Sequence, residues 1–175
     1  MPETPSSILV GTTKGAFRMH RDAAQTDWHV AGPFCDGWPI NHLAGDPDSG
    51  TIWAGGGGDW SGAGVWRSED HGATWEVTRL TTGEMDSWAA ADPDFAEMIG
   101  WTEAELPFGD MFSQIWSLHF ANGALYAGTK PAGLLVSRDL GTTWDRVEGL
   151  TTHPSAADWN PGAAGLVLHT IVSDP

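Results

Sequence analysis

Short apolar runs alternate with clusters of glycine, serine, threonine and aspartate from one end of the chain to the other. Residues 8–10 and 52–54 are typical, because each run reaches a glycine after only a few positions. No long segment keeps apolar residues at the three- and four-residue spacing of an amphipathic helix. Short strands with a turn signal about every 8–12 residues predict an all-β fold.

One acidic stretch, residues 82–113, departs from this pattern. Asp92 followed by Pro93 is typical of a helix cap and a first helical position, and Gly100 is typical of a helix end. Residues 102–105 read Thr-Glu-Ala-Glu, which is the order of a capping box. The stretch therefore predicts an insertion that contains short helices.

Three segments of the chain can be laid over one another, so the sequence contains an internal repeat. In each copy a glycine ends the first strand and a tryptophan opens the third. The glycines are Gly11, Gly55 and Gly128, and the tryptophans are Trp28, Trp75 and Trp144. The interval between the first two glycines matches the roughly 40–50 residues of a four-stranded propeller blade. The next interval is longer by about the length of the acidic insertion.

A further strand, with apolar ends around two variable positions, precedes the second and third copies and recurs after the third. These strands are Ile40 to Leu43, Ile115 to Leu118 and Leu168 to Ile171. The pattern predicts a partial β-propeller of about three blades, each with four antiparallel strands, and a short helical insertion. Within one domain, 1–175, we expect blade 1 at 7–32, blade 2 at 39–81, the insertion at 82–113, blade 3 at 114–148, and a loop with the first strand of blade 4 at 149–175.

The octad Ser-x-Asp-x-Gly-x-Thr-Trp occurs twice, at residues 68–75 and 137–144, at the same turn of two copies. An aspartate at a turn accepts hydrogen bonds from backbone N–H groups, and glycine adopts a positive φ there without strain. We therefore expect each octad to be a structural lock for its hairpin. The locking residues would be Ser68, Asp70, Gly72 and Trp75, and Ser137, Asp139, Gly141 and Trp144.

The octads resemble the Asp-box of the bacterial neuraminidase repeat (BNR) family, in which sialidases, xyloglucanases, sortilin-type receptors and photosystem assembly factors share β-propellers. ILVGTTKGAF, QIWSL, AGTKPAGL and HPSAADWNPGAAGLVLHTIVSDP are similar to segments of bacterial Asp-box proteins labelled sialidase-like or glycosyl hydrolase. Those relatives are longer, so the resemblance implies the N-terminal half of a propeller. The label implies carbohydrate as the substrate class.

A sialidase would use three arginines for the substrate carboxylate, a tyrosine nucleophile activated by glutamate, and an aspartic acid as proton donor. The only tyrosine, Tyr126, occupies the strand position of Leu9 and Trp53. Arg67 and Arg138 lie at the octad turns, and the Phe/Tyr-Arg-Ile-Pro motif is absent. We therefore expect no true sialidase activity from this chain.

Charge narrows the range of partners. Eight lysines and arginines against 23 aspartates and glutamates give a net charge of -15, which repels nucleic acid and anionic membranes. No apolar run approaches the roughly 20 residues of a membrane span. Cys35, the single cysteine, fits a reducing compartment, so we expect a cytoplasmic protein.

The loops at one end of the predicted propeller gather tryptophans and carboxylates. Aromatic rings can stack on the C–H faces of sugars while carboxylates accept hydroxyl hydrogen bonds, although the same tryptophans could instead close the ends of the blades. Candidate ligand-binding residues are Trp38, Trp60, Trp88, Trp159, His153 and Lys130. Candidate catalytic carboxylates are Asp36, Asp59, Glu84, Asp86 and Asp158.

The leading hypothesis is a non-catalytic binding or scaffold module for a saccharide or a protein. The alternative is a glycoside-hydrolase-like enzyme whose site is completed by a missing half or by a second chain. The histidines lack the close pairing of a metal motif, and no phosphate loop follows the glycine run at 55–58, so we expect neither a metal nor a cofactor. An unpaired inner strand at 168–174 and the missing inner strand of the first copy predict either a homodimer that completes the propeller or a poorly soluble half propeller, and not a stable monomer.

Overall fold

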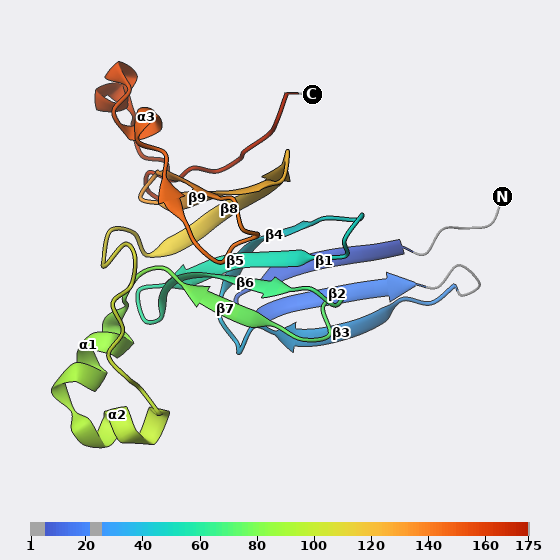
Figure 1. The fold of residues 1–175 in the computed structure, drawn as a ribbon, viewed down its shortest axis with the longest axis horizontal. Helices are drawn as coiled ribbons and strands as arrows, with labels where there is room; N and C mark the ends of the chain where they lie inside the picture. Colours follow the sequence, from blue (N-terminus) through green and yellow to red (C-terminus); the bar gives the residue numbers. More distant parts are fainter. Residues whose placement is uncertain (1–5, 22–25, 175) are drawn as a thin grey trace.

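The structure is a computed structural model that describes residues 6–21 and 26–174. Its strands form three separate antiparallel sheets, drawn in blue, in teal to green, and in yellow to orange in Figure 1. In every sheet the strands follow one another along the chain and pair with their sequence neighbours. The expected all-β architecture of short antiparallel meanders is therefore confirmed.

Each sheet corresponds to one copy of the repeat. Sheet 1 contains β1 (Ser6–Thr12), β2 (Gly15–Arg21) and β3 (His29–Phe34). Sheet 2 contains β4 (Ile40–Gly45), β5 (Ile52–Gly58), β6 (Gly62–Ser68) and β7 (Glu76–Arg79). Sheet 3 contains β8 (Gln114–Ala121), β9 (Ala124–Lys130), β10 (Leu134–Ser137) and β11 (Asp145–Arg146).

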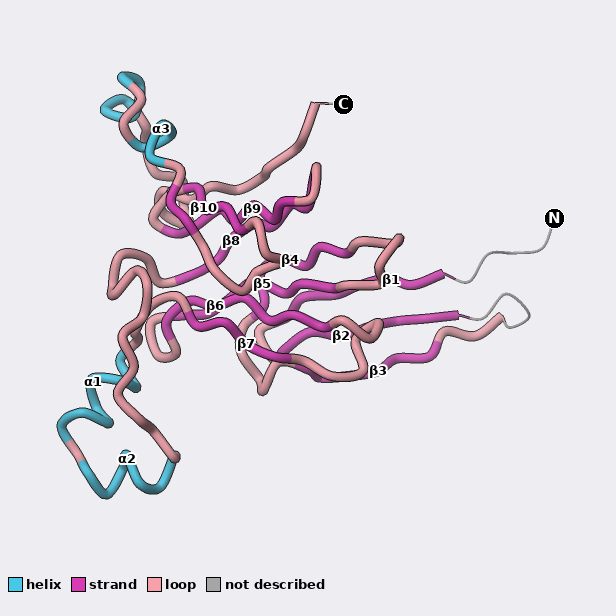
Figure 2. The backbone as a smooth tube through the Cα atoms, viewed as in Figure 1, coloured by secondary structure: helices cyan, strands magenta, loops and turns pink. Residues whose placement is uncertain are grey.

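Neighbouring sheets meet along their inner strands. Strand β1 contacts β4, and β8 contacts both β4 and β5, so the three sheets stand in sequence as blades of a partial propeller. Figure 2 shows the same order along the backbone tube, with the strands in magenta. The main core cluster lies between sheets 2 and 3 and includes Trp53, Leu80, Ile115 and Leu125.

Three glycines allow the sheets to approach closely. A Cβ atom built on each one would lie within 2.6 Å of an atom in the segment that follows at the next inner position. The pairs are Gly11 with Ile40, Gly55 with Ile115, and Gly128 with Leu168. These are the glycines and apolar residues that the repeat alignment places at equivalent positions, so the same close packing recurs at all three junctions.

The C-terminal segment corrects one expectation. Residues 166–174 form no strand, although the sequence predicts the first strand of a fourth blade from Leu168 onward. The N–H of Leu168 donates to the Thr129 carbonyl at 3.1 Å, and its carbonyl accepts from Ser117 Oγ at 2.7 Å. The segment thus lies at an inner-strand position beside β8 and β9. It forms no ladder because the described residues offer it no second strand of its own blade.

The acidic insertion contains helices α1 (Glu84–Ala91) and α2 (Pro93–Ile99), at the lower left of Figure 1. Asp92 accepts hydrogen bonds from the first two free N–H groups of α2, and Gly100 ends the helix at φ 65°. The predicted cap and stop are therefore confirmed. The capping box expected at residues 102–105 is wrong, because these residues are exposed and form no helix that could bury an apolar face.

Two further helical segments follow sheet 3. They are α3 (Glu148–Thr151) and a 3-10 helix at Pro154–Asp158, neither of which the sequence pattern predicts. Cys35 lies in a second core cluster between sheets 1 and 2, and burial raises the pKa of its thiol to about 12. The thiol is therefore un-ionised at neutral pH and is not poised as a nucleophile.

Candidate functional site

The two octads form the same hydrogen-bonded turn. In the second octad, Asp139 Oδ1 accepts from the Thr143 N–H at 2.8 Å, and Oδ2 accepts from Thr143 Oγ1 at 2.6 Å. Ser137 Oγ donates to Asp139 Oδ1 at 2.8 Å and accepts from the Gly141 N–H at 2.7 Å. The Trp144 indole donates to the Gly141 carbonyl at 3.1 Å. The side chains of Ser137, Asp139, Thr143 and Trp144 are thus bonded to one another and to the backbone within the octad.

The first octad repeats these contacts at Ser68, Asp70, Gly72, Thr74 and Trp75. Hydrogen bonds from Thr74 hold the pKa of Asp70 well below its usual range. The corresponding bonds from Thr143 lower the pKa of Asp139 to about 2. Both carboxylates therefore stay ionised across the neutral range and serve as acceptors, which is not the behaviour of a catalytic acid.

Replacing Ser137 with alanine is expected to lower the free energy of unfolding by about 1–3 kcal/mol, because the buried Gly141 N–H loses its acceptor. Ser137 is only 1% exposed, so water cannot readily take the place of the hydroxyl. Urea denaturation followed by circular dichroism measures the change. Arg138→Ala in the same octad is the control, because its ion pair with Asp145 is exposed and contributes little. Equal stability of the two variants would contradict a locking role.

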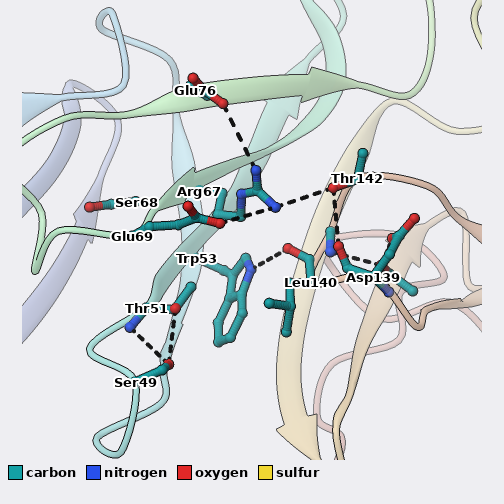
Figure 3. Close-up of polar contacts among 12 residues, drawn as sticks. Ser49, Thr51, Trp53, Arg67, Ser68, Glu69, Glu76, Asp139, Leu140 and Thr142 are labelled. Atoms are coloured by element: carbon teal, nitrogen blue, oxygen red, sulfur yellow. Dashed lines mark hydrogen bonds and ion pairs between the residues drawn. The ribbon is translucent and has the colours of Figure 1, made fainter.

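The octads also join neighbouring blades. At the junction of sheets 2 and 3, the Trp53 indole donates to the Leu140 carbonyl at 2.8 Å (Figure 3). Arg67 Nη1 donates to Thr142 Oγ1 at 3.2 Å in the same region. At the junction of sheets 1 and 2, Arg18 Nη1 donates to the His71 carbonyl. The octads therefore hold both their own hairpins and the preceding blade.

A pair of exposed tryptophans lies where the insertion meets the β5–β6 turn. The rings of Trp60 and Trp88, which we call the tryptophan pair, have centroids 5.7 Å apart and planes at 75°, an edge-to-face contact. They remain 46% and 62% exposed. The N–H groups of Glu84 and Met85 donate to the carbonyls of Asp59 and Trp60, which attaches helix α1 to this turn. Asp59 and Glu84 are themselves exposed beside the pair.

Asp86, another candidate carboxylate, is committed to a structural network. It accepts hydrogen bonds from Arg79 at 2.6 Å, from the Gly83 N–H at 2.9 Å and from the Trp101 indole at 2.9 Å. Burial by itself raises the pKa of Asp86, but these hydrogen bonds outweigh it and hold the pKa below its usual range. The network fastens both ends of the helical insertion to strand β7.

The remaining candidates are dispersed. Trp38 is half-buried and packs edge-on against Trp66 at 5.9 Å, which gives it a place in the core. Lys130 lies 5.6 Å from the centroid of the Trp116 ring. The remaining candidates lie on separate loops: Asp36 before β4, and His153, Asp158 and Trp159 around the 3-10 helix, where His153 and Trp159 both contact Ser155.

Three histidines come from successive inner positions of the blades. His42 Nδ1 accepts the Leu118 N–H at 3.2 Å, which requires a neutral acceptor nitrogen. Burial lowers the pKa of His42, and the charges of His119 and His169 lower it further. Within residues 6–21 and 26–174, no group of three or more histidine, cysteine, aspartate or glutamate side chains is placed to hold a metal ion.

No helix in the described part of the chain is both long enough and apolar enough to cross a membrane. No protein-family model matches the sequence, and no curated protein matches it. Solved structures similar to this chain include "YCF48 bound to D1 peptide", with a TM-score of 0.45 and 15% identity. The match covers 84% of this chain and 43% of that one, so the chain spans less than half of the length of that structure.

Proposed function

We propose that this chain is a non-catalytic binding module and that its ligand contacts the tryptophan pair. The observation that carries the proposal is the edge-to-face contact of Trp60 and Trp88, which holds two rings in a fixed arrangement yet leaves about half of each in water. Exposed aromatic surface rimmed by polar groups marks interaction sites in folded proteins. The backbone bonds to Asp59 and Trp60 fix helix α1 in place, so the surface is formed before a ligand arrives.

A neutral saccharide fits this surface best. The indole faces offer stacking area for C–H groups, and the exposed carboxylates of Asp59 and Glu84 offer acceptors for hydroxyl groups. The acidic insertion, within a chain of net charge -15, disfavours anionic ligands. The hydrogen-bonding pattern of the octads supports assignment of the chain to the Asp-box repeat proteins, with these turns in a structural role.

Replacing Trp60 or Trp88 with alanine is expected to weaken ligand binding by at least ~30-fold, as for a central aromatic contact. A glycan array that carries neutral and sialylated saccharides identifies the ligand, and calorimetry of wild type and variants measures the loss. Trp28→Ala is the matched control, because Trp28 is also exposed (37%) but lies directly before β3 of sheet 1. Selective binding of sialylated glycans, or equal loss in the control, would contradict the proposal.

A protein partner is the other ligand class consistent with this surface. If no neutral glycan binds but lysine-rich peptides bind in a manner that requires Trp60 and Trp88, the ligand is a protein. That result would support the tryptophan pair as the binding site and would contradict a saccharide as its ligand. Glycosidase chemistry is less well supported, because Asp86 is fully engaged by Arg79, Gly83 and Trp101.

We further propose a second copy of the chain as a partner. Strand β1 has no hydrogen-bonded strand on its inner side among the described residues, and the segment at 168–171 lies at an inner position without a ladder. The segment of one copy can pair with β1 of the other, which would satisfy both edges. Light scattering is expected to show a dimer that salt favours, because salt screens the charge of -15 per chain. A stable, cooperatively folded monomer at all salt concentrations would contradict this.

A further inference from the structure

At the junction of sheets 1 and 2 and at the junction of sheets 2 and 3, the carbonyl at the same position of the octad accepts a hydrogen bond, but the donors differ. Between sheets 2 and 3, the Leu140 carbonyl accepts from the Trp53 indole. Between sheets 1 and 2, the carbonyl of His71 accepts from the guanidinium of Arg18. His71 and Leu140 occupy the same octad position and share a positive φ, 59° and 60°. The two junctions are therefore directly comparable, residue by residue.

Leu9 is the counterpart of Trp53. The strand registers show this, since Leu9 pairs with Arg18 and Trp53 pairs with Arg67. At the second junction the indole fills the space beside Gly141, where an added Cβ would lie 3.5 Å from the ring. Leucine is smaller than tryptophan and has no hydrogen-bond donor. The first junction therefore lacks both the ring and its hydrogen bond.

A pocket of about 630 Å³ lies at this first junction. This volume is within the roughly 300–1,000 Å³ of small-molecule sites. Leu9 and Ile52 contribute apolar walls, and the lining also includes the β4–β5 turn. The basic side chains in the lining are those of Arg18, Arg21, His20 and His71.

The pocket is basic in an acidic protein. Two of the eight lysines and arginines line it, in a chain of net charge -15. The carboxylate of Asp46, the acid in the lining, is engaged by Ser49 Oγ at 2.6 Å and by the Asp48 N–H at 3.1 Å. Arg18 Nε and His20 Nδ1 are shielded from water and have no hydrogen-bond partner in the described part of the chain. Such atoms are rare in folded proteins, so the guanidinium retains donor capacity.

We propose that this pocket binds a small aromatic carboxylate. The flat ring takes the place beside Leu9 and Ile52 that the indole of Trp53 takes at the second junction. The carboxylate pairs with the guanidinium groups of Arg18 and Arg21, which suit two-oxygen anions. The site does not depend on the tryptophan pair, because the β4–β5 turn and the β5–β6 turn are at opposite ends of β5.

Calorimetric titration with indole-3-acetate tests the proposal, because this probe combines an indole ring with a carboxylate. We expect saturable binding at one site per chain. The neutral indole-3-ethanol and the cationic tryptamine should bind at least ~10-fold more weakly, since they lack the charged hydrogen bonds to arginine. No saturable binding of indole-3-acetate, or equal binding of all three compounds, would overturn the proposal.

Variants locate the site. Arg18→Gln should weaken indole-3-acetate at least ~10-fold through the lost charge-assisted bond. Arg67→Gln, the register counterpart at the second junction, should leave binding unchanged. Leu9→Trp should fill the pocket and abolish binding while the circular dichroism spectrum stays native. Binding retained in folded Leu9→Trp, or equal loss in both arginine variants, overturns the assignment; if Leu9→Trp fails to fold, the arginine pair decides.

Discussion

Replacing Trp53 with leucine is expected to lower the free energy of unfolding by about 3 kcal/mol, near the lower end of the range for removing a buried tryptophan. The side chain is 1% exposed and stacks on Phe120 with ring centroids 4.9 Å apart. Its loss leaves a cavity in the main core and removes the only hydrogen bond given to the Leu140 carbonyl in the described part of the chain. Both effects fall on the contact that joins sheet 2 to sheet 3 (Figure 3).

Urea denaturation of wild type and Trp53→Leu measures this loss. Trp53→Phe separates the two contributions, because phenylalanine keeps an aromatic ring but cannot donate to Leu140. Trp88→Leu is the control, since that indole is 62% exposed and surface changes usually stay within ~0.5 kcal/mol. If Trp53→Leu matches this control, the junction does not contribute to stability in the way described.

Replacing Asp86 with alanine is expected to lower the free energy of unfolding by about 3 kcal/mol, because it leaves the partly buried guanidinium of Arg79 without its ion-pair partner. The Gly83 N–H and the Trp101 indole lose their acceptor at the same time. Differential scanning calorimetry measures the loss. Glu97→Gln, at an exposed position on α2, is the control and should change stability little.

The same carboxylate gives stability a pH dependence of known sign. The pKa of Asp86 is lower in the folded protein than its ordinary value, so the unfolded chain binds the proton more readily. The stabilisation that ionised Asp86 provides is therefore present above the pKa of aspartate in the unfolded chain, which is ~4. It is lost as the pH falls toward the lower pKa of Asp86 in the folded protein. The stability of Asp86→Asn should fall less steeply on acidification than that of wild type. If the stabilities of the two proteins fell in parallel with pH, the ionisation of Asp86 would not be the source of the pH dependence.

The strands were predictable because glycine and turn residues mark their ends locally. Helix α2 was predictable for the same reason, since Asp92 and Gly100 lie at its two ends. Helix α1 was not, because Gly83 has no side chain to cap it. Its first turn is instead held by Asp86, whose partner Arg79 belongs to a strand. Such a contact between separate elements leaves no local mark in the sequence.

The candidate site was likewise predictable only in part, because its residues could be named from the sequence but their contacts could not. Trp60 and Trp88 both appeared among the candidates, but their edge-to-face contact joins a turn to a helix that the pattern did not predict. The alignment of Leu9 with Trp53 was visible in the repeat, yet the space it leaves depends on how sheets 1 and 2 pack. The strand expected at Leu168 does not form, because a hydrogen-bonded ladder requires a neighbouring strand. The periodicity of the sequence describes each strand by itself and does not show whether such a neighbour is present.

The close approach at Gly11, Gly55 and Gly128 has a mechanical consequence for the whole assembly. Two of the three contacts would bring a Cβ against a backbone carbonyl, of Ile40 and of Leu168, and main-chain atoms cannot repack as side chains can. At Gly11 and Gly128 the separation from the next inner segment is therefore limited by main-chain atoms, whereas at Gly55 the nearest atom is Cγ2 of the Ile115 side chain. At the junction of sheets 1 and 2, where the Ile40 carbonyl limits the approach, a tryptophan at position 9 can therefore fill the pocket without bringing the two sheets closer together.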